Sequence, residues 1–126
     1  MWEWFKSMQV DRKDFARKFV RGMYRKPQSE EYLNRITAAS LKAPTNTAVT
    51  LLGNVLASSD MRPVLTKIDR PVLYTVTAPL KAQGEMLRQK VPAARVEVFE
   101  EAGHALFVDD AERFNRVVEE WLREPK

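Results

Sequence analysis

His104 is the side chain with the clearest capacity for chemistry, and it is the single histidine among the 126 residues. It follows Gly103 after a short segment, residues 95–99, in which polar and apolar side chains alternate as they do in a β-strand. A neutral imidazole can act as a general base toward a hydroxyl group or a water molecule. A glycine–histidine pair just beyond a strand therefore indicates a candidate catalytic base.

A histidine base needs partners, and the sequence offers few of them. Efficient acyl transfer requires a nucleophile, a carboxylate that fixes the tautomer of the imidazole, and donors for the developing oxyanion. Hydroxyl and carboxylate groups occur together at Ser58, Ser59 and Asp60, and three carboxylates lie close to His104 in sequence: Glu100, Glu101 and Asp109. The alternative interpretation is structural, with Asp60 and Asp109 as helix caps and the two serines in a solvated linker.

The composition excludes several classes of site. The chain has no cysteine, which excludes disulfides, thiolate metal ligands and a cysteine nucleophile, and one histidine argues against a structural zinc site. We therefore expect neither a metal nor another cofactor. Hydrophobic residues at 44% and charged residues at 30% are typical of an ordered globular protein. The first residues do not resemble a signal peptide, and no apolar run approaches the ~18 residues of a membrane span, so we expect a cytoplasmic location.

The net charge of +4 is concentrated near the N-terminus. Residues 11–26 contain seven basic and two acidic side chains, and Arg17, Arg21 and Arg25 share one stripe of a predicted helix. Such a stripe could bind a membrane surface or nucleic acid, but basic residues alone supply only non-specific affinity. We favour a solvated helix face and expect no specific nucleic-acid partner.

The first half of the chain has the pattern of a helical segment. Asp11 is predicted to cap a helix that runs to about Arg25, with Phe15 and Phe19 on its apolar stripe and Ala16 and Val20 beside it. Ser29 is predicted to cap a second helix, and a third is predicted to begin near Pro44 and to end at about residue 57.

The second half alternates strand and helix. Residues 71–77 are rich in β-branched and apolar side chains, which predicts a strand buried on both faces. A helix over residues 82–91, a second strand around Val96 and Val98, and a final helix that begins at Asp109 or Asp110 are expected to follow. A strand, a helix and a strand in this order predict a right-handed parallel unit.

From Asp60 to Leu122 the sequence resembles the C-terminal third of an α/β-hydrolase of the esterase or lipase type. The resemblance lies in residues 65–73 (Leu-Thr-Lys-Ile-Asp-Arg-Pro-Val-Leu), 91–99 (Val-Pro-Ala-Ala-Arg-Val-Glu-Val-Phe), 102–109 (Ala-Gly-His-Ala-Leu-Phe-Val-Asp) and 112–115 (Glu-Arg-Phe-Asn). It implies an α/β fold in which residues 60–126 form a βαβα unit with two parallel strands. It further implies that residues 1–59 correspond to the helical cap of such enzymes, and that His104 is the catalytic base.

Two features depart from the pattern of that family. Its nucleophile lies in a Gly-x-Ser-x-Gly turn, and none of the four glycines here takes part in such a motif. Its acid commonly follows the penultimate strand, where this chain has residues 76–80 (Val-Thr-Ala-Pro-Leu) and no carboxylate before Glu85. The resemblance places Ser59 and Asp60 near the same edge of the fold. Ser59, Asp60 and Glu85 are therefore the candidates to complete a catalytic site with His104.

The resemblance to part of a larger enzyme also implies self-association. A sheet of two parallel strands is not stable alone, and an open apolar edge favours pairing with another chain. We expect a homo-oligomer, a dimer or a higher assembly, in which oligomerisation or domain exchange completes the truncated fold.

Three functions remain open on these grounds. The first is weak hydrolysis of small-molecule esters, with His104 as the base in a cleft of the oligomer. The second is a non-catalytic, self-associating fragment. The third is one chain of a split hydrolase, whose partner chain supplies the nucleophilic serine.

Overall fold

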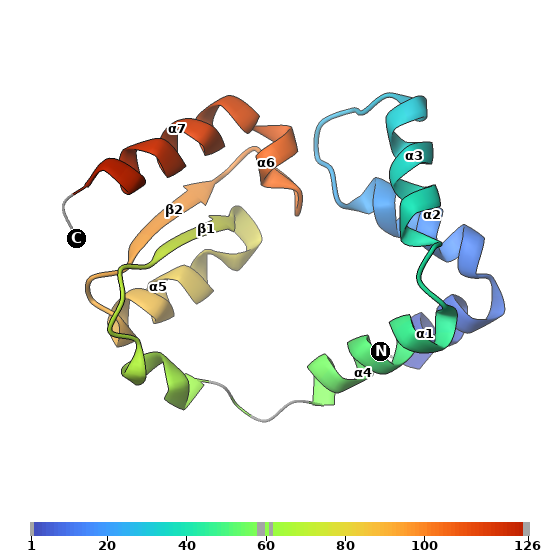
Figure 1. The fold of residues 1–126 in the computed structure, drawn as a ribbon, viewed down its shortest axis with the longest axis horizontal. Helices are drawn as coiled ribbons and strands as arrows, with labels where there is room; N and C mark the ends of the chain where they lie inside the picture. Colours follow the sequence, from blue (N-terminus) through green and yellow to red (C-terminus); the bar gives the residue numbers. More distant parts are fainter. Residues whose placement is uncertain (1, 58–59, 61, 125–126) are drawn as a thin grey trace. The chain divides into compact units, whose positions relative to one another are not determined.

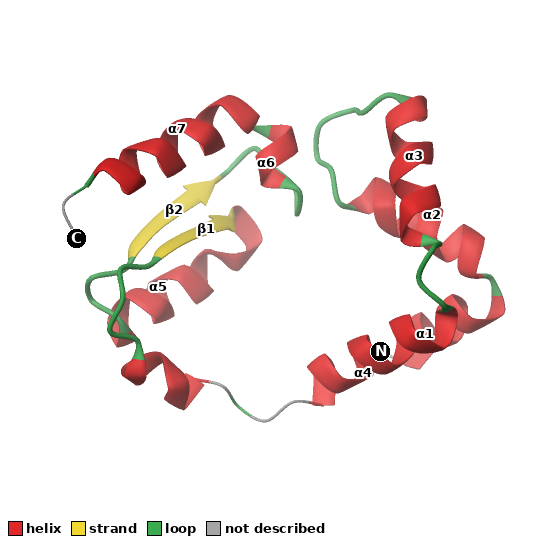
Figure 2. Cartoon of the chain, viewed as in Figure 1, coloured by secondary structure: helices red, strands yellow, loops and turns green. Residues whose placement is uncertain are grey.

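The computed structural model describes residues 2–57, 60 and 62–124 of the chain. The chain divides into two compact units. The first comprises Met1–Met23 and Pro27–Ser59, and the second comprises Tyr24–Lys26 and Asp60–Lys126. The first unit is helical, and the second contains a small sheet with helices on both faces (Figures 1 and 2).

Two helices of the helical unit begin where the sequence predicted them. A side-chain oxygen of Asp11 accepts a hydrogen bond from the N–H of Asp14 at 2.9 Å. Oγ of Ser29 accepts one from the N–H of Tyr32 at 3.2 Å. Each cap satisfies an N–H group that has no acceptor within its helix. The described helices of this unit are α1 (Trp2–Val10), α2 (Arg12–Gly22), α3 (Glu30–Ser40) and α4 (Thr45–Ala57).

The buried face of α2 is shifted from the predicted apolar stripe. Ala16 and Val20 are almost completely buried, whereas Phe19 is 48% exposed. The aromatic side chains of this stripe instead pack against α1, a helix that the sequence did not predict. Trp4 of α1 packs edge-on against Phe15, with ring centroids 4.9 Å apart, so the large rings pack beside one another while the small side chains form the core.

Helix α2 also ends three residues earlier than expected, at Gly22 instead of Arg25. The backbone N–H groups of Arg25 and Lys26 donate to the carboxylate of Asp109, at 2.7 and 3.3 Å. These N–H groups therefore do not continue the helix. Because the acceptor lies more than eighty residues away in sequence, local propensity could not indicate this end.

The second unit has the predicted order of strand, helix and strand. Strands β1 and β2 are parallel, with a register that runs from Leu73 opposite Arg95 to Thr77 opposite Phe99. Helix α5 lies against one face of this sheet and α7 against the other (Figure 1). The elements are η1 (Arg62–Lys67), β1 (Leu73–Thr77), η2 (Ala78–Leu80), α5 (Lys81–Lys90), β2 (Arg95–Phe99), α6 (Leu106–Asp109) and α7 (Ala111–Arg123).

Helix α5 approaches the sheet closely at Gly84. A Cβ atom at this position would lie 2.6 Å from Cγ1 of Val96 and 3.4 Å from Cγ1 of Val76. Real Cβ atoms essentially never come as close as the first distance, so Gly84 is required by packing rather than by backbone conformation.

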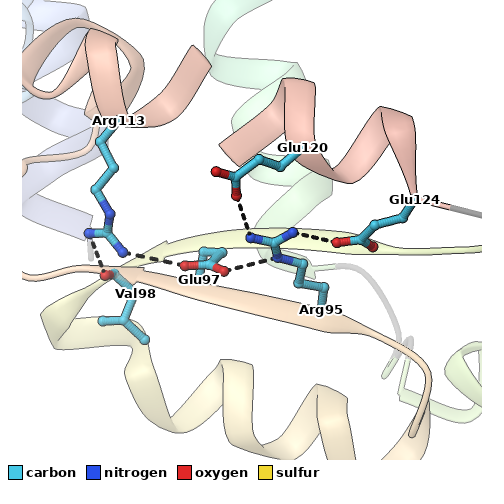
Figure 3. A network of polar contacts seen from close by, with 6 residues as sticks. All are labelled: Arg95, Glu97, Val98, Arg113, Glu120 and Glu124. Atoms are coloured by element: carbon cyan, nitrogen blue, oxygen red, sulfur yellow. Dashed lines mark hydrogen bonds and ion pairs between the residues drawn. The ribbon is translucent and has the colours of Figure 1, made fainter. Parts of the chain in front are cut away.

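The face of the sheet under α7 combines a small apolar core with a polar network (Figure 3). Phe99 is fully buried, and the guanidinium carbon of Arg113 lies 4.2 Å from the centroid of its ring. Arg113 also donates to the carbonyl of Val98 at 2.9 Å. Arg95 forms ion pairs with three carboxylates, those of Glu97, Glu120 and Glu124. These contacts hold α7 on β2.

The prediction that the first strand is buried on both faces is wrong for this chain. Only Val76 of β1 is buried, and the other residues of the strand are half-buried. Among the residues that the structure describes, β1 pairs with β2 alone, so its other edge has no strand partner. The apolar composition of β1 suits a strand within a wider sheet.

Candidate functional site

His104 lies in the loop between β2 and α6, beyond the carboxyl end of its strand. Its side chain is exposed, and it makes no hydrogen bond or ion pair with any residue in the described ranges. Because β1 and β2 are parallel, residues that follow β1 reach the same edge of the sheet. An exposed imidazole at this edge is accessible to a small molecule.

The loop that carries His104 is attached to a buried carboxylate, that of Asp109. One oxygen, Oδ2, accepts from the N–H of Gly103 at 2.7 Å and from the N–H of Arg25 at 2.7 Å. The other, Oδ1, accepts from the N–H of Lys26 at 3.3 Å. The Asp109 residue is only 4% exposed. Burial raises the pKa of this carboxyl, but the N–H donors of Arg25, Gly103 and Lys26 outweigh burial and leave the pKa below its ordinary value.

The interpretation of Asp109 as a helix cap is therefore wrong. It is the last residue of α6, and its carboxylate turns back to the loop that precedes that helix. Asp110 occupies the N-cap position of α7 and makes no side-chain cap bond. The sequence contains one signal for this arrangement, the adjacent pair Asp109-Asp110. Only one of two adjacent residues can occupy the N-cap position of α7, so the other must have a different role.

Arg25 holds the same loop from its other end. Its guanidinium donates to the carbonyl of Glu100 at 2.8 Å and pairs with the carboxylate of Glu101 at 3.2 Å. The prediction that Arg25 belongs to a basic helix face is wrong, because α2 ends before it. The segment Tyr24–Lys26 thus contacts both the start and the end of the loop that leads to His104.

The other two arginines of the predicted basic stripe pair within the helical unit. Arg17 forms an ion pair with Asp14 at 3.1 Å, and Arg21 forms one with Glu30. Pairs of this kind on an exposed helix surface support the interpretation of a solvated face.

Two of the three candidate partners of His104, Asp60 and Glu85, lie within the described residues, and their local environments differ. Asp60 accepts hydrogen bonds from the guanidinium of Arg62 at 2.8 Å and from the backbone N–H of Arg62 at 2.9 Å, and these bonds lower the pKa of Asp60 to about 2. Glu85 lies on the exposed surface of α5. Ser59 lies outside the described residues, as does Ser58. In the part of the chain that the structure describes, neither Asp60 nor Glu85 forms a hydrogen bond or an ion pair with His104, so the roles of all three candidates stay predictions.

Two surface cavities occur away from His104. One, of about 490 Å³, lies on the helical unit, and its wall contains three aromatic residues, Trp4, Phe15 and Phe19, together with polar residues such as Asp14 and Lys18. The other, of about 500 Å³, lies beside the amino end of β2, with Arg95 and Trp121 in its wall. Neither cavity includes the candidate base.

Within residues 2–57, 60 and 62–124, no three histidine or acidic side chains are grouped as metal ligands would be. No helix in those same ranges has the length and apolar character needed to cross a bilayer.

Comparisons with known proteins give matches at the level of structure. No protein-family model matches the sequence, and no curated protein is found to be related to it. An esterase from Exiguobacterium antarcticum superposes with a TM-score of 0.83 at 22% identity, over 97% of this chain and 47% of that one. A bromoperoxidase from Bacillus anthracis superposes with a TM-score of 0.84 at 18% identity, over 97% of this chain and 48% of that one. A putative aryl esterase from Burkholderia cenocepacia gives a TM-score of 0.76 at 20% identity.

These solved structures are α/β-hydrolases, and this chain spans about half the length of each. At sequence identities of 18–22%, this likeness shows a similar fold and nothing more. The helical unit and the small parallel sheet together correspond to part of that fold. The chain thus has a partial α/β-hydrolase fold.

Proposed function

We propose that this chain is a hydrolase that cleaves small-molecule esters with His104 as its general base. The observation that supports this most directly is the position of the imidazole. It is exposed on a loop at the carboxyl edge of a parallel sheet, and hydrogen bonds from Gly103 and Arg25 to a buried carboxylate hold that loop.

In the proposed reaction His104 takes a proton from water while the water oxygen bonds to the acyl carbon. The tetrahedral intermediate then collapses as the bond between the acyl carbon and the alkoxy oxygen breaks. The imidazolium returns the proton to the leaving oxygen, so the products are an acid and an alcohol. A base of this kind contributes about 10²-fold or more over the uncatalysed reaction.

We further propose that the active form is a homo-oligomer. The support is β1, whose apolar strand has one edge without a strand partner among the described residues. Strand edges of this kind pair with other chains, and a symmetric dimer is the commonest outcome. A second copy could also bring Ser59, Asp60 or Glu85 to the His104 of the first.

The test is the hydrolysis of p-nitrophenyl acetate by the purified chain and by His104→Ala. Gln89→Ala, which truncates an exposed polar side chain of α5, is the matched control. We expect His104→Ala to reduce the rate about 10²-fold toward background and Gln89→Ala to leave it unchanged. A His104→Ala variant with the wild-type rate would overturn the proposal. Light scattering during size-exclusion chromatography tests the assembly, and a uniform monomer would contradict it.

A second candidate, one chain of a split hydrolase, is favoured by the half-length coverage of the solved structures. The support from sequence is the lack of a Gly-x-Ser-x-Gly turn. Mixing the chain with a polypeptide that carries the missing half of such a fold, including this turn, provides the test. This candidate requires co-elution of the two chains and an esterase rate that depends on His104.

The remaining possibility is a fragment that self-associates without catalysis. It would be supported if the chain forms a dimer or higher oligomer while wild type and His104→Ala both hydrolyse the ester at the background rate.

A further inference from the structure

The carboxylate of Asp109 connects two segments that are far apart in sequence. Its Oδ2 atom is shared by the N–H of Gly103, the residue before His104, and by the N–H of Arg25. Both distances are 2.7 Å, which is typical of a hydrogen bond to an ionised acceptor. A single oxygen atom therefore fixes the backbone of the loop relative to the backbone of Tyr24–Lys26.

Because Asp109 is buried, its carboxylate needs these hydrogen bonds to offset the loss of contact with water. A carboxylate with 4% exposure is unfavourable unless its oxygens accept hydrogen bonds, and here all three donors are main-chain N–H groups. Main-chain donors do not rotate away as a lysine or arginine side chain can. The position of the loop is thus tied to the backbone rather than to a flexible ion pair.

The side chain of Arg25 adds a second attachment at the beginning of the same loop. It donates to the carbonyl of Glu100 at 2.8 Å and pairs with Glu101 at 3.2 Å. Asp109 holds the end of the loop at Gly103. The four residues between Phe99 and His104 are therefore fixed at both ends, and His104 has little freedom of backbone movement.

We propose that Asp109 is the positioning residue of His104: by joining Gly103 to Tyr24–Lys26, it sets the direction in which the imidazole leaves the sheet edge. It acts through the loop and does not touch the imidazole. Its role in esterase turnover rests on the proposed function, whereas its role in holding His104 does not.

The first experiment uses the wild-type chain and needs no variant. Long-range HNCO spectra detect couplings across hydrogen bonds, and we expect correlations from the amide nitrogens of Gly103 and Arg25 to the carboxylate carbon of Asp109. Their absence in an otherwise complete spectrum would overturn the proposal.

The second experiment compares Asp109→Asn with Asp110→Asn, a matched control that removes the neighbouring charge from a side chain without a cap bond. Because His104 is the only histidine, its imidazole gives a single set of carbon–proton signals. Asparagine keeps one oxygen at this site but loses the charge and turns an NH2 group toward the N–H of Lys26. In Asp109→Asn we therefore expect this set to shift or split, and the amides of Gly103 and Arg25 to exchange at least about tenfold faster. The β2 amides should remain as in wild type, and in Asp110→Asn the His104 signals and the exchange of the Gly103 and Arg25 amides should remain as in wild type. Unchanged His104 signals in a folded Asp109→Asn variant would overturn the proposal.

A kinetic measurement separates positioning from general stability. In Asp109→Asn we expect kcat for p-nitrophenyl acetate to fall about 10- to 100-fold with little change in KM, because a misplaced base loses its reactive geometry. If wild type has no esterase activity that depends on His104, the proposed function fails while the spectroscopic result still decides the role of Asp109. If that activity exists and Asp109→Asn retains the full kcat, the positioning role fails alone.

Discussion

Replacement of Gly84 by alanine tests the packing of α5 against the sheet. In an isolated helix this change stabilises by about 0.5–1 kcal/mol, because alanine has the higher helix propensity. Here the added Cβ would lie 2.6 Å from Cγ1 of Val96, so the helix or the strand must shift. Overpacking of this kind costs about 1–3 kcal/mol. We therefore expect Gly84→Ala to lower the free energy of unfolding by about 1 kcal/mol.

The same argument predicts a change of sign when Val96 is truncated. Val96→Ala removes Cγ1, the atom that causes the clash, and leaves Cγ1 of Val76 at 3.4 Å from the new Cβ. In the Val96→Ala background, Gly84→Ala should stabilise by about 0.5–1 kcal/mol. The two substitutions should therefore show a coupling free energy of about 1–3 kcal/mol in a double-mutant cycle.

Urea denaturation followed by far-UV circular dichroism measures these quantities. Gly53→Ala in α4 is the matched control, because a Cβ at that position meets no described atom within 4 Å. It should stabilise by about 0.5–1 kcal/mol. The reasoning is refuted if Gly84→Ala stabilises the wild-type chain as much as Gly53→Ala does, or if the cycle shows no coupling.

Two further predictions concern the polar groups of the second unit. Asp109→Ala leaves the N–H groups of Gly103 and Arg25 without their acceptor and should cost about 2–5 kcal/mol at neutral pH. The pKa of Asp109 is lower in the folded chain than its ordinary value of 3.8. The contribution of the ionised carboxylate to the free energy of unfolding is therefore fully present above pH 3.8, and it is lost as the pH falls through the pKa of the folded chain. Urea titrations of wild type and variant should thus converge in acid, and a difference that is independent of pH would contradict the assignment. Arg113→Ala removes the contact with the Phe99 ring and the bond to the carbonyl of Val98, and should cost about 1–3 kcal/mol by the same assay. Arg113→Lys retains the positive charge near the ring, so we expect it to lose less stability than Arg113→Ala. An equal loss of unfolding free energy in the two variants would contradict this prediction.

Much of the secondary structure was predictable because its causes are local. Asp11 and Ser29 cap their helices through side chains that reach N–H groups three residues ahead. The two strands follow from runs of β-branched and apolar residues, and the helix between them ends before Pro92. The parallel pairing was expected because a helix connects the strands.

The failures share a different cause, which is contact between distant segments. The end of α2 at Gly22 and the role of Asp109 depend on the same hydrogen bonds, whose partners lie 83 and 84 residues apart. The packing of Phe15 and Phe19 depends on Trp4 of α1, and the half-burial of β1 depends on the extent of the sheet. None of these follows from periodicity or from a capping motif.

The sequence by itself determined the kinds of elements, their order, and a histidine placed just after a strand, because these depend on residues within a few positions of one another. The tertiary structure alone decided what holds that histidine. Asp109 lies five residues after His104, but two of its three donors come from Tyr24–Lys26, at the other end of the chain. A buried carboxylate must find donors wherever folding brings main-chain N–H groups together, and no local pattern specifies that place.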